Sequence, residues 1–120
     1  MKFIQPTNNM CCEDIIKCVF DLNDLDIQIY KKLRENKELR ADILAKKIGK
    51  DRSTVYRSLQ KLTCCGICIK KTKNIETGGY FHVYTNNNIK ITKKKLEECI
   101  DNWYNKMKKT LKHFEELEKS

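Results

Sequence analysis

The chain has 120 residues, is 40% hydrophobic and 34% charged, and carries a formal net charge of +9 at pH 7. This length allows one domain, or one domain with an appended helix, and this hydrophobic fraction allows a core that needs no metal or disulfide. The sequence has no run of about 18 apolar residues and no signal-peptide-like N-terminus, so we expect a cytoplasmic protein with no membrane partner.

The positive charge is concentrated in the middle of the chain. Residues 31–88 carry fourteen Lys or Arg against five acidic residues, whereas residues 1–30 carry two against five. A small protein with such a basic segment usually binds a polyanion, such as a nucleic acid or an acidic membrane surface. The alternative is a lysine-rich surface of the kind found in thermophiles, which has no such partner.

The apolar pattern predicts two helices near the start of the chain, after a loose or extended stretch over residues 1–9. Residues 11–20 form a short amphipathic candidate. Residues 24–35 form a stronger one, with Asn23 as the N-cap and an apolar stripe at helical spacing. We therefore expect an N-terminal segment over residues 1–22.

Two further helices follow in the basic part of the chain. The first spans Arg40 to Ile48 and ends at Gly49, while the second runs from about Arg52 to Cys65, with Asp51 as its N-cap. A helix-turn-helix needs a small residue where its helices cross and a sharp turn between them, and Ala45 and Gly49 meet these needs. The two helices therefore have the make-up of a helix-turn-helix.

The second of these helices has an apolar face and a polar face. Val55, Leu59 and Leu62, at i, i+4 and i+7, are expected to be buried. The opposite face offers the donors, acceptors and cations that a helix in a major groove should offer, and consists of Arg52, Ser53, Tyr56, Arg57 and Gln60, with Lys61 at its edge. Two ordinary amphipathic helices with a solvated polar face would give the same pattern.

The next residues predict a basic two-stranded hairpin, which would make the motif a winged helix-turn-helix. Ile67 to Lys71 and Tyr80 to Tyr84 are predicted strands, and residues 74–79 are a predicted turn with Gly78 and Gly79 at its tip. We expect lysines of this wing and its flanks to contact the DNA backbone or minor groove. They are Lys46, Lys47, Lys50, Lys70, Lys71 and Lys73.

A long helix from about Thr92 to Lys119 is predicted last. Its apolar residues lie at a spacing close to a heptad seam, and are Leu96, Ile100, Trp103, Met107, Phe114 and Leu117. A helix of this length is too long for so small a domain to bury entirely, so we expect it to mediate dimerisation by packing against the partner's copy of the same helix or against the partner's N-terminal helix. The alternative is that the stripe belongs to the chain's own core. The dimer would hold two recognition helices about 34 Å apart, one turn of B-DNA.

The predicted fold class is therefore mainly α with a small β-hairpin wing, an α+β winged helix-turn-helix with a long C-terminal dimerisation helix. We divide the chain into an N-terminal segment and short helix over residues 1–22, a DNA-binding domain over residues 23–88 and a dimerisation helix over residues 89–120.

Three stretches carry a family resemblance: Leu44-Ala-Lys-Lys-Ile-Gly, Arg52-Ser-Thr-Val-Tyr-Arg-Ser-Leu-Gln-Lys-Leu and Gly79-Tyr-Phe-His-Val-Tyr. With them, the run from Leu25 to Tyr84 resembles the TrmB/MarR-like winged-helix transcription regulators of archaea. The resemblance implies a homodimer that presents two recognition helices to a pseudo-palindromic operator. It also implies that Arg52, Ser53, Thr54, Tyr56 and Arg57 read bases or contact the backbone. The larger TrmB regulators have a C-terminal sugar-binding domain that this sequence lacks, so sensing of that type is not expected.

Seven cysteines are unusual in a cytoplasmic protein; they are Cys11, Cys12, Cys18, Cys64, Cys65, Cys68 and Cys99. Their odd number excludes a full set of internal disulfides. Cys64, Cys65 and Cys68 lie between the recognition helix and the wing, where they could form a redox or metal switch. Zinc sites usually pair two C-x-x-C units or pair Cys with His, so we expect no metal and favour core packing, above all for Cys18, Cys68 and Cys99.

An enzyme is not expected. The only histidines are His82 and His113, and no Ser/His/Asp set, phosphate-binding glycine loop or pair of buried carboxylates can be assembled. We therefore predict no catalytic residues and no cofactor. The predicted function is a homodimeric transcription regulator that binds specific double-stranded DNA, with no particular small-molecule effector indicated. The alternatives are a thiol- or metal-responsive regulator and a winged-helix module that binds another protein.

Overall fold

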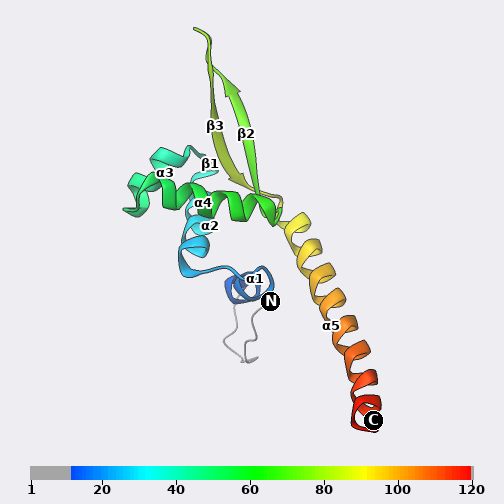
Figure 1. Ribbon diagram of the computed structural model, residues 1–120. Helices are drawn as coiled ribbons and strands as arrows, with labels where there is room; N and C mark the ends of the chain where they lie inside the picture. Colours follow the sequence, from blue (N-terminus) through cyan, green and yellow to red (C-terminus); the bar gives the residue numbers. More distant parts are fainter. Residues whose placement is uncertain (1–11, 120) are drawn as a thin grey trace.

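The computed structural model describes residues 12–119, and within them five helices accompany a three-stranded antiparallel sheet (Figure 1). The predicted loose start over residues 1–9, and Cys11, lie outside this range. The architecture is the winged helix that the sequence predicts: a helical body, a long two-stranded wing and a C-terminal helix that leaves the body.

The helices are α1 (Cys12–Val19), α2 (Asp24–Asn36), α3 (Ala41–Ile48), α4 (Arg52–Cys64) and α5 (Ile89–Lys119). The bounds of the first four agree with the predicted ones to within one residue. The last helix begins three residues earlier than predicted. The reason is a local cap: the side-chain oxygen of Asn88 accepts a hydrogen bond of 2.8 Å from the backbone N–H of Lys90.

The strands are β1 (Glu38–Leu39), β2 (Cys68–Asn74) and β3 (Tyr80–Asn86), in the order β1-β3-β2. The hairpin of β2 and β3 pairs from Cys68 opposite Asn86 to Asn74 opposite Tyr80, so both strands are longer than predicted. Strand β1 was not predicted from the sequence; it pairs Leu39 with Tyr84 of β3 and connects the wing to the segment between α2 and α3.

The core lies where α2, α3 and α4 meet the base of the wing. Its fully buried members include Ile29, Leu33, Leu44 and Ile67. The predicted inner face of α4 is buried: Val55, Leu59 and Leu62 have no exposed surface. Tyr84 and Cys68 bring the base of the wing into the same cluster, so the recognition helix and the wing are packed on one core.

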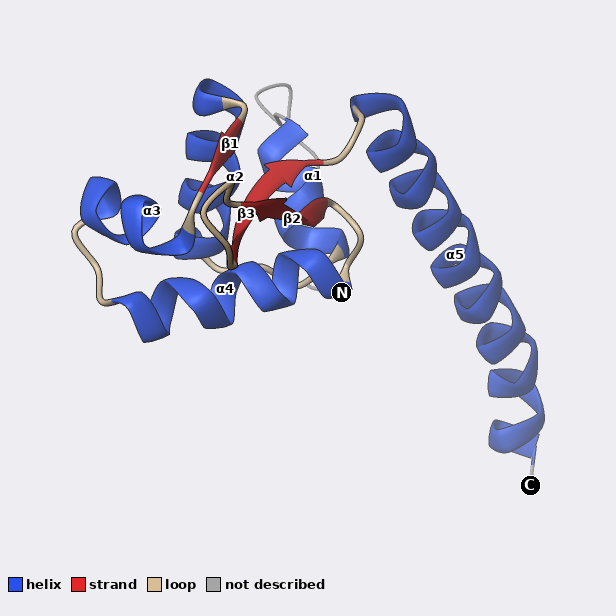
Figure 2. Cartoon of the chain, turned by 90° about the horizontal axis from the view of Figure 1, so that it is seen from above, coloured by secondary structure: helices blue, strands red, loops and turns tan. Residues whose placement is uncertain are grey.

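The last helix, α5, runs away from this body (Figures 1 and 2). It contacts α1 near its start, and its remaining length gives the chain a long dimension of 71 Å against 30 and 27 Å. None of the helices within residues 12–119 is long and apolar enough to cross a membrane.

Candidate nucleic-acid interface

The turn between α3 and α4 has the geometry that the sequence predicts. Gly49 adopts a left-handed backbone conformation, with φ of 79°, and its N–H donates a hydrogen bond of 2.8 Å to the carbonyl of Ala45. A residue with a side chain would be strained in this conformation. Ala45 is buried. The small residue and the sharp turn therefore set the angle at which α4 is presented.

The polar face of α4 is open to solvent. Arg52, Ser53, Tyr56, Arg57 and Gln60 are all exposed. Thr54 and Lys61, at the edges of this face, are half-buried and have partners within the chain. The structure thus brings five of the seven candidate reading residues together on one free surface.

The start of α4 is held by a side-chain contact rather than by a cap of the usual kind. Asp51 occupies the predicted N-cap position, but its carboxylate accepts a hydrogen bond from the hydroxyl of Thr54 and none from a backbone N–H near the helix start. This hydrogen bond lowers the pKa of Asp51. The Thr54 hydroxyl is therefore already hydrogen-bonded in the protein without DNA, whereas within residues 12–119 the Ser53 hydroxyl has no such hydrogen bond.

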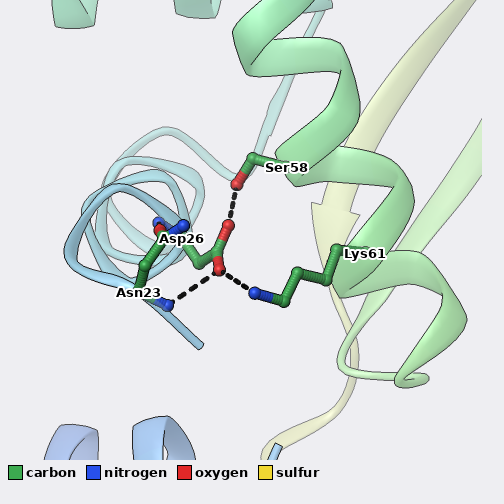
Figure 3. Close-up of polar contacts among 4 residues, drawn as sticks. All are labelled: Asn23, Asp26, Ser58 and Lys61. Carbon is green, nitrogen blue, oxygen red and sulfur yellow. Dashed lines mark hydrogen bonds and ion pairs between the residues drawn. The ribbon is translucent and has the colours of Figure 1, made fainter. Parts of the chain in front are cut away.

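A buried carboxylate anchors the middle of α4 to the start of α2 (Figure 3). Asp26 is 1% exposed, and its carboxylate accepts hydrogen bonds from the backbone N–H of Asn23 at 2.9 Å, from the Ser58 hydroxyl and from the Lys61 ammonium at 2.8 Å. Asn23 in turn accepts from the N–H of Asp26 at 2.8 Å, which completes a capping box. Asp26 thus caps α2 and at the same time fixes α4.

This network affects ionisation as well as geometry. Burial opposes ionisation of Asp26, but the hydrogen bonds from Lys61, Ser58 and Asn23 outweigh it and lower the pKa of Asp26. Asn23 was predicted as the N-cap of α2, whereas the role of Asp26 was not predicted. The Asn-x-x-Asp spacing could have indicated the capping box. Because Lys61 is held by Asp26, its ammonium has less freedom to contact a ligand than the sequence analysis assumed.

The two faces of the wing differ in what they offer. Residues directly opposite each other in an antiparallel pair share a face. Lys70 pairs with Tyr84, and these two line a hollow of about 460 Å³ together with Tyr56 and Gln60 of α4. Lys70 therefore faces the recognition helix.

The other wing lysines lie on the opposite face. Lys71 is opposite Val83, and Lys73 is opposite Phe81. Lys73 forms an ion pair of 3.5 Å with Glu38 of β1. The three wing lysines thus divide into one beside α4 and two on the far side of the sheet.

A second hollow, of about 250 Å³, lies between the start of α4, the start of α3 and β3. Arg52 and Tyr56 of α4 line it, together with Arg40, Tyr80 and His82. The carboxylate of Asp42 also lines this hollow and forms an ion pair of 3.4 Å with Arg40, so one of the two guanidinium groups already has an acidic partner there. Arg40 and Tyr80 were not predicted as DNA-binding residues, although Arg40 directly precedes α3 and Tyr80 belongs to one of the stretches that carry the family resemblance.

The remaining flanking cations lie on α3 and in the turn after it. Lys46, Lys47 and Lys50 are exposed. Within residues 12–119, none of these three lysines forms an ion pair of 4 Å or less with an acidic side chain, and neither does Arg52 or Arg57.

The cysteines beside the recognition helix differ in burial. Cys64 is exposed, Cys65 is half-buried, and Cys68 is buried with its thiol 3.3 Å from the side-chain oxygen of Asn86. Burial raises the pKa of Cys65, and it raises the pKa of Cys68 to about 12. Both thiols are therefore held in the protonated form, which is the less reactive one. Cys18 is buried and Cys99 is half-buried, but of the three cysteines favoured for core packing only Cys68 belongs to the core cluster.

No group of three or more metal-ligating side chains gathers within residues 12–119. The cysteines of this range are free thiols.

The stripe on α5 is exposed over most of its length. Ile100, Trp103, Met107, Phe114 and Leu117 are each 39–73% exposed. Leu96 differs, because it packs against the core. Leu111, which was not among the predicted stripe residues, is 64% exposed and lies beside the stripe between Met107 and Phe114, next to Thr110 at the heptad position itself. Its position four residues after Met107 was the signal that could have identified it.

Comparison with known proteins assigns a family to this arrangement. The sequence profile of the family described as "Sugar-specific transcriptional regulator TrmB" matches residues 16–101, well over half of the chain. The chain belongs to the TrmB family. The match includes α2 to α4, the wing and the first part of α5.

Relatives of this TrmB-family protein occur in methanogenic archaea. It is 32% identical over 110 residues to the uncharacterized protein MJ1503 of Methanocaldococcus jannaschii, covering 92% of this chain and 83% of that protein. It is 33% identical over 107 residues to MJ1082 of the same organism, covering 89% of this chain and 88% of that protein.

Solved structures share its fold. A possible transcriptional regulator from Methanosarcina mazei superposes with a TM-score of 0.75 at 28% identity, covering 86% of this chain and 88% of that one. The ST1889 protein of Sulfolobus tokodaii has the same fold, with a TM-score of 0.64 at 19% identity over 79% and 93% of the two chains. This TrmB-family protein is accordingly a transcription regulator and not an enzyme.

Proposed function

We propose that this regulator binds specific sequences of double-stranded DNA as a homodimer in the cytoplasm, with α4 in the major groove and the wing on the backbone or minor groove. One observation carries the proposal: α4 buries Val55, Leu59 and Leu62 completely while its opposite face is exposed and basic. A helix that presents donors, acceptors and cations on a rigid support is suited to reading base edges.

The proposed contacts divide into readers and backbone contacts. Arg57 and Arg52 are the best candidates for guanine or phosphate, because guanidinium binds both in a bidentate manner. The remaining readers are Ser53, Thr54, Tyr56 and Gln60, with Lys61 at the edge. The lysines assigned to the backbone are Lys46, Lys47, Lys50, Lys70, Lys71 and Lys73. To these we add Arg40, Tyr80 and His82, because they line the same hollow as Arg52.

The proposed dimer uses the exposed stripe of α5: Leu96, Ile100, Trp103, Met107, Leu111, Phe114 and Leu117. An isolated helix favours acidic residues at its start and basic ones at its end. In α5 the order is reversed: residues 89–95 contain four lysines and no acidic residue, and residues 114–118 contain three glutamates. Antiparallel pairing of two copies would bring the lysine-rich start of each helix toward the acidic end of the other. This charge pattern supports an antiparallel dimer.

The experiment that tests the proposal is fluorescence anisotropy with duplexes selected from a genomic DNA pool. We expect a selected palindrome to bind about 10³-fold or more tightly than random duplex. Equal and salt-sensitive binding to all duplexes would contradict the proposal and favour a winged-helix module that binds another protein.

We expect the variant Arg57→Ala to bind the selected duplex about 1–3 kcal/mol more weakly and to discriminate less between bases at one position of each half-site. The reason is that Arg57 is exposed in the middle of the polar face and can reach two acceptors of one base. Anisotropy against a panel of single-base changes measures both effects. The control is Arg34→Ala, which removes an exposed arginine of α2 paired with Glu13. Unchanged affinity and specificity in Arg57→Ala would remove Arg57 from the readers.

We expect Lys71→Ala to weaken the binding of all sequences alike, because a phosphate contact carries no sequence information. The slope of log affinity against log salt should also decrease by about 1. The control is Lys112→Ala on α5, which has the same charge change away from the wing. A loss confined to some sequences would mean that the wing reads bases.

A further inference from the structure

An apolar groove lies between α1 and the start of α5, away from the candidate DNA interface. It has a volume of about 350 Å³, and its lining includes Ile15 and Ile16 of α1 and Lys93, Leu96 and Ile100 of α5. Leu96 and Ile100 are also the first two residues of the stripe assigned to the dimer. The groove and the exposed stripe therefore form one continuous apolar surface, so a second copy that covers the stripe also reaches the groove.

The charges of α5 alternate in blocks along the helix. Residues 90–95 contain four lysines and no acidic residue, and residues 97–101 contain three acidic residues and no basic one. The pattern then repeats, with four lysines and no acidic residue in residues 106–112 and three glutamates in residues 115–118. Such blocks favour one register of an antiparallel pair, because charges that stand level across a seam attract or repel each other.

Every block meets the opposite charge when Trp103 stands level with Met107 of the partner subunit. Residues 93–95 are then level with the partner's residues 115–117, and residues 97–101 with its residues 109–113, because the rise per residue is equal in the two helices. Lys95 is thus level with the partner's Glu115, and Asp101 is level with the partner's Lys109. Two-fold symmetry makes each of these pairings occur twice.

Sliding the partner by one heptad gives the opposite result. Ile100 is then level with the partner's Leu117, and residues 97–101 stand level with residues 116–120, where two glutamates lie. The lysines of residues 106–112 stand level with the same lysines of the partner. Like charges across the seam destabilise this second register.

The first register brings the end of the partner's α5 into the groove. The partner's Phe114 is level with Leu96, and the partner's Leu117 is level with Lys93, whose methylene stem can pack against it. Leu96 and Lys93 both line the groove. Within a single chain Phe114 is 58% exposed and Leu117 is 73% exposed. Seating them in the groove buries apolar surface on both copies.

We propose that the groove between α1 and α5 receives Phe114 and Leu117 of a second copy of this chain, so that α1 belongs to the dimer interface and each groove is complete only in the dimer. The proposal rests on the homodimer of the proposed function, to which it gives a register and a second contact surface. Each α5 thus contacts both α5 and α1 of the other copy.

Mixed labelling tests the groove directly. Full chain with ¹³C-labelled methyl groups of Ile and Leu is mixed with unlabelled chain and left to exchange subunits, and isotope-filtered NOE spectra then record only contacts between copies. We expect NOEs from the methyl groups of Ile15, Ile16 and Leu96 to the ring protons of the partner's Phe114. NOEs from Leu117 to the partner's Phe114 would indicate a parallel pair and overturn the proposal.

Charge reversal tests the register independently. One variant carries Lys94→Glu together with Lys95→Glu, and the other carries Glu115→Lys together with Glu116→Lys. At low salt, where surface charges are least screened, the dissociation constant of each homodimer should rise by about tenfold or more. An equal mixture of the two variants is the control, because it contains the same substitutions but restores opposite charges at every pairing. It should form a heterodimer about as tightly as the unsubstituted chain forms its homodimer in sedimentation velocity.

Several outcomes would overturn the register or the groove alone. In the second register Lys94 and Lys95 lie beyond the end of the partner's helix, so unchanged dimerisation of the first variant would contradict the proposal. NOEs from the groove only to Phe3 of the same chain would mean that the chain covers its own groove.

The proposal and the proposed function fail in different ways. A chain that is monomeric at every concentration would contradict the homodimer and the proposal together. A dimer with the expected contacts that binds no DNA would contradict the DNA-binding function and leave the proposal standing.

Discussion

The variant Asp26→Ala is expected to lower the free energy of unfolding by about 2–4 kcal/mol, a large effect for a domain of this size. The substitution removes half of the capping box of α2, and it leaves the buried Ser58 hydroxyl without its acceptor. The ion pair with Lys61 adds little to this sum, because the Lys61 side chain is 41% exposed and its ammonium can return to water.

Urea unfolding followed by circular dichroism measures this change. The control is Asp42→Ala, which removes a half-buried aspartate whose ion pair with Arg40 is open to solvent, and it should change stability by no more than about 0.5 kcal/mol. Asp26→Asn separates shape from charge, because it keeps an acceptor for one neighbour but loses the attraction of the Lys61 ammonium. Equal stability of Asp26→Ala and the unsubstituted chain would contradict the anchoring role of Asp26.

The same carboxylate predicts a pH dependence. The pKa of Asp26 is lower in the folded protein than its value of 3.8 in the unfolded chain, so the ionised form is stabilised by folding. The resulting contribution to stability is fully present above the unfolded pKa and is lost as the pH falls through the lower folded pKa. The difference in free energy of unfolding between Asp26→Asn and the unsubstituted chain should therefore be constant between about pH 5 and 7. It should become smaller below about pH 4, as the unsubstituted chain loses the contribution of the ionised carboxylate. A difference that stays constant down to pH 2.5 would contradict this assignment.

Local sequence patterns were sufficient to predict the helices and the wing. Val55, Leu59 and Leu62 repeat at helical spacing, and their complete burial follows from that periodicity. Gly49 marks a turn that few other residues can form. By contrast, β1 has only two residues and no periodicity of its own. It exists because Leu39 pairs with Tyr84, a contact between distant parts of the chain.

In the candidate site, too, some features follow from local sequence patterns and others depend on contacts between distant residues. Helical periodicity identifies the exposed residues of α4, whereas the hollow that adds Arg40, Tyr80 and His82 depends on how the wing docks beside α4. Strand alternation separates Lys70 from Lys71, but only the packing of Tyr84 into the core decides which of them faces α4. The contact from Asp26 to Ser58 and Lys61 joins positions 32 and 35 residues apart, which no local pattern indicates.

The variant Trp103→Glu is expected to convert the proposed dimer into a monomer and to reduce affinity for the selected palindrome by about 100-fold or more. Trp103 is 39% exposed, near the middle of the stripe on α5. A carboxylate there would have to be buried against apolar residues of the second copy, which is costly without a partner charge. The loss of the dimer also removes the gain that comes from linking two recognition helices. Sedimentation velocity measures the oligomeric state, and anisotropy measures the affinity.

The control is Asn105→Glu, which adds the same charge to an exposed position on the other side of α5. It should remain dimeric and bind the palindrome normally. Trp103→Glu should still bind a single half-site as the unsubstituted chain does, because α4 and the wing do not contain the change. Reversing Glu115, Glu116 and Glu118 to lysine tests the antiparallel arrangement separately: like charges would then meet near the lysine-rich start of the partner helix, and the dimer should dissociate at low salt. A dimer that is unaffected by both sets of changes would mean that the two copies associate through another surface, and the charge pattern of α5 would then have to serve a different contact.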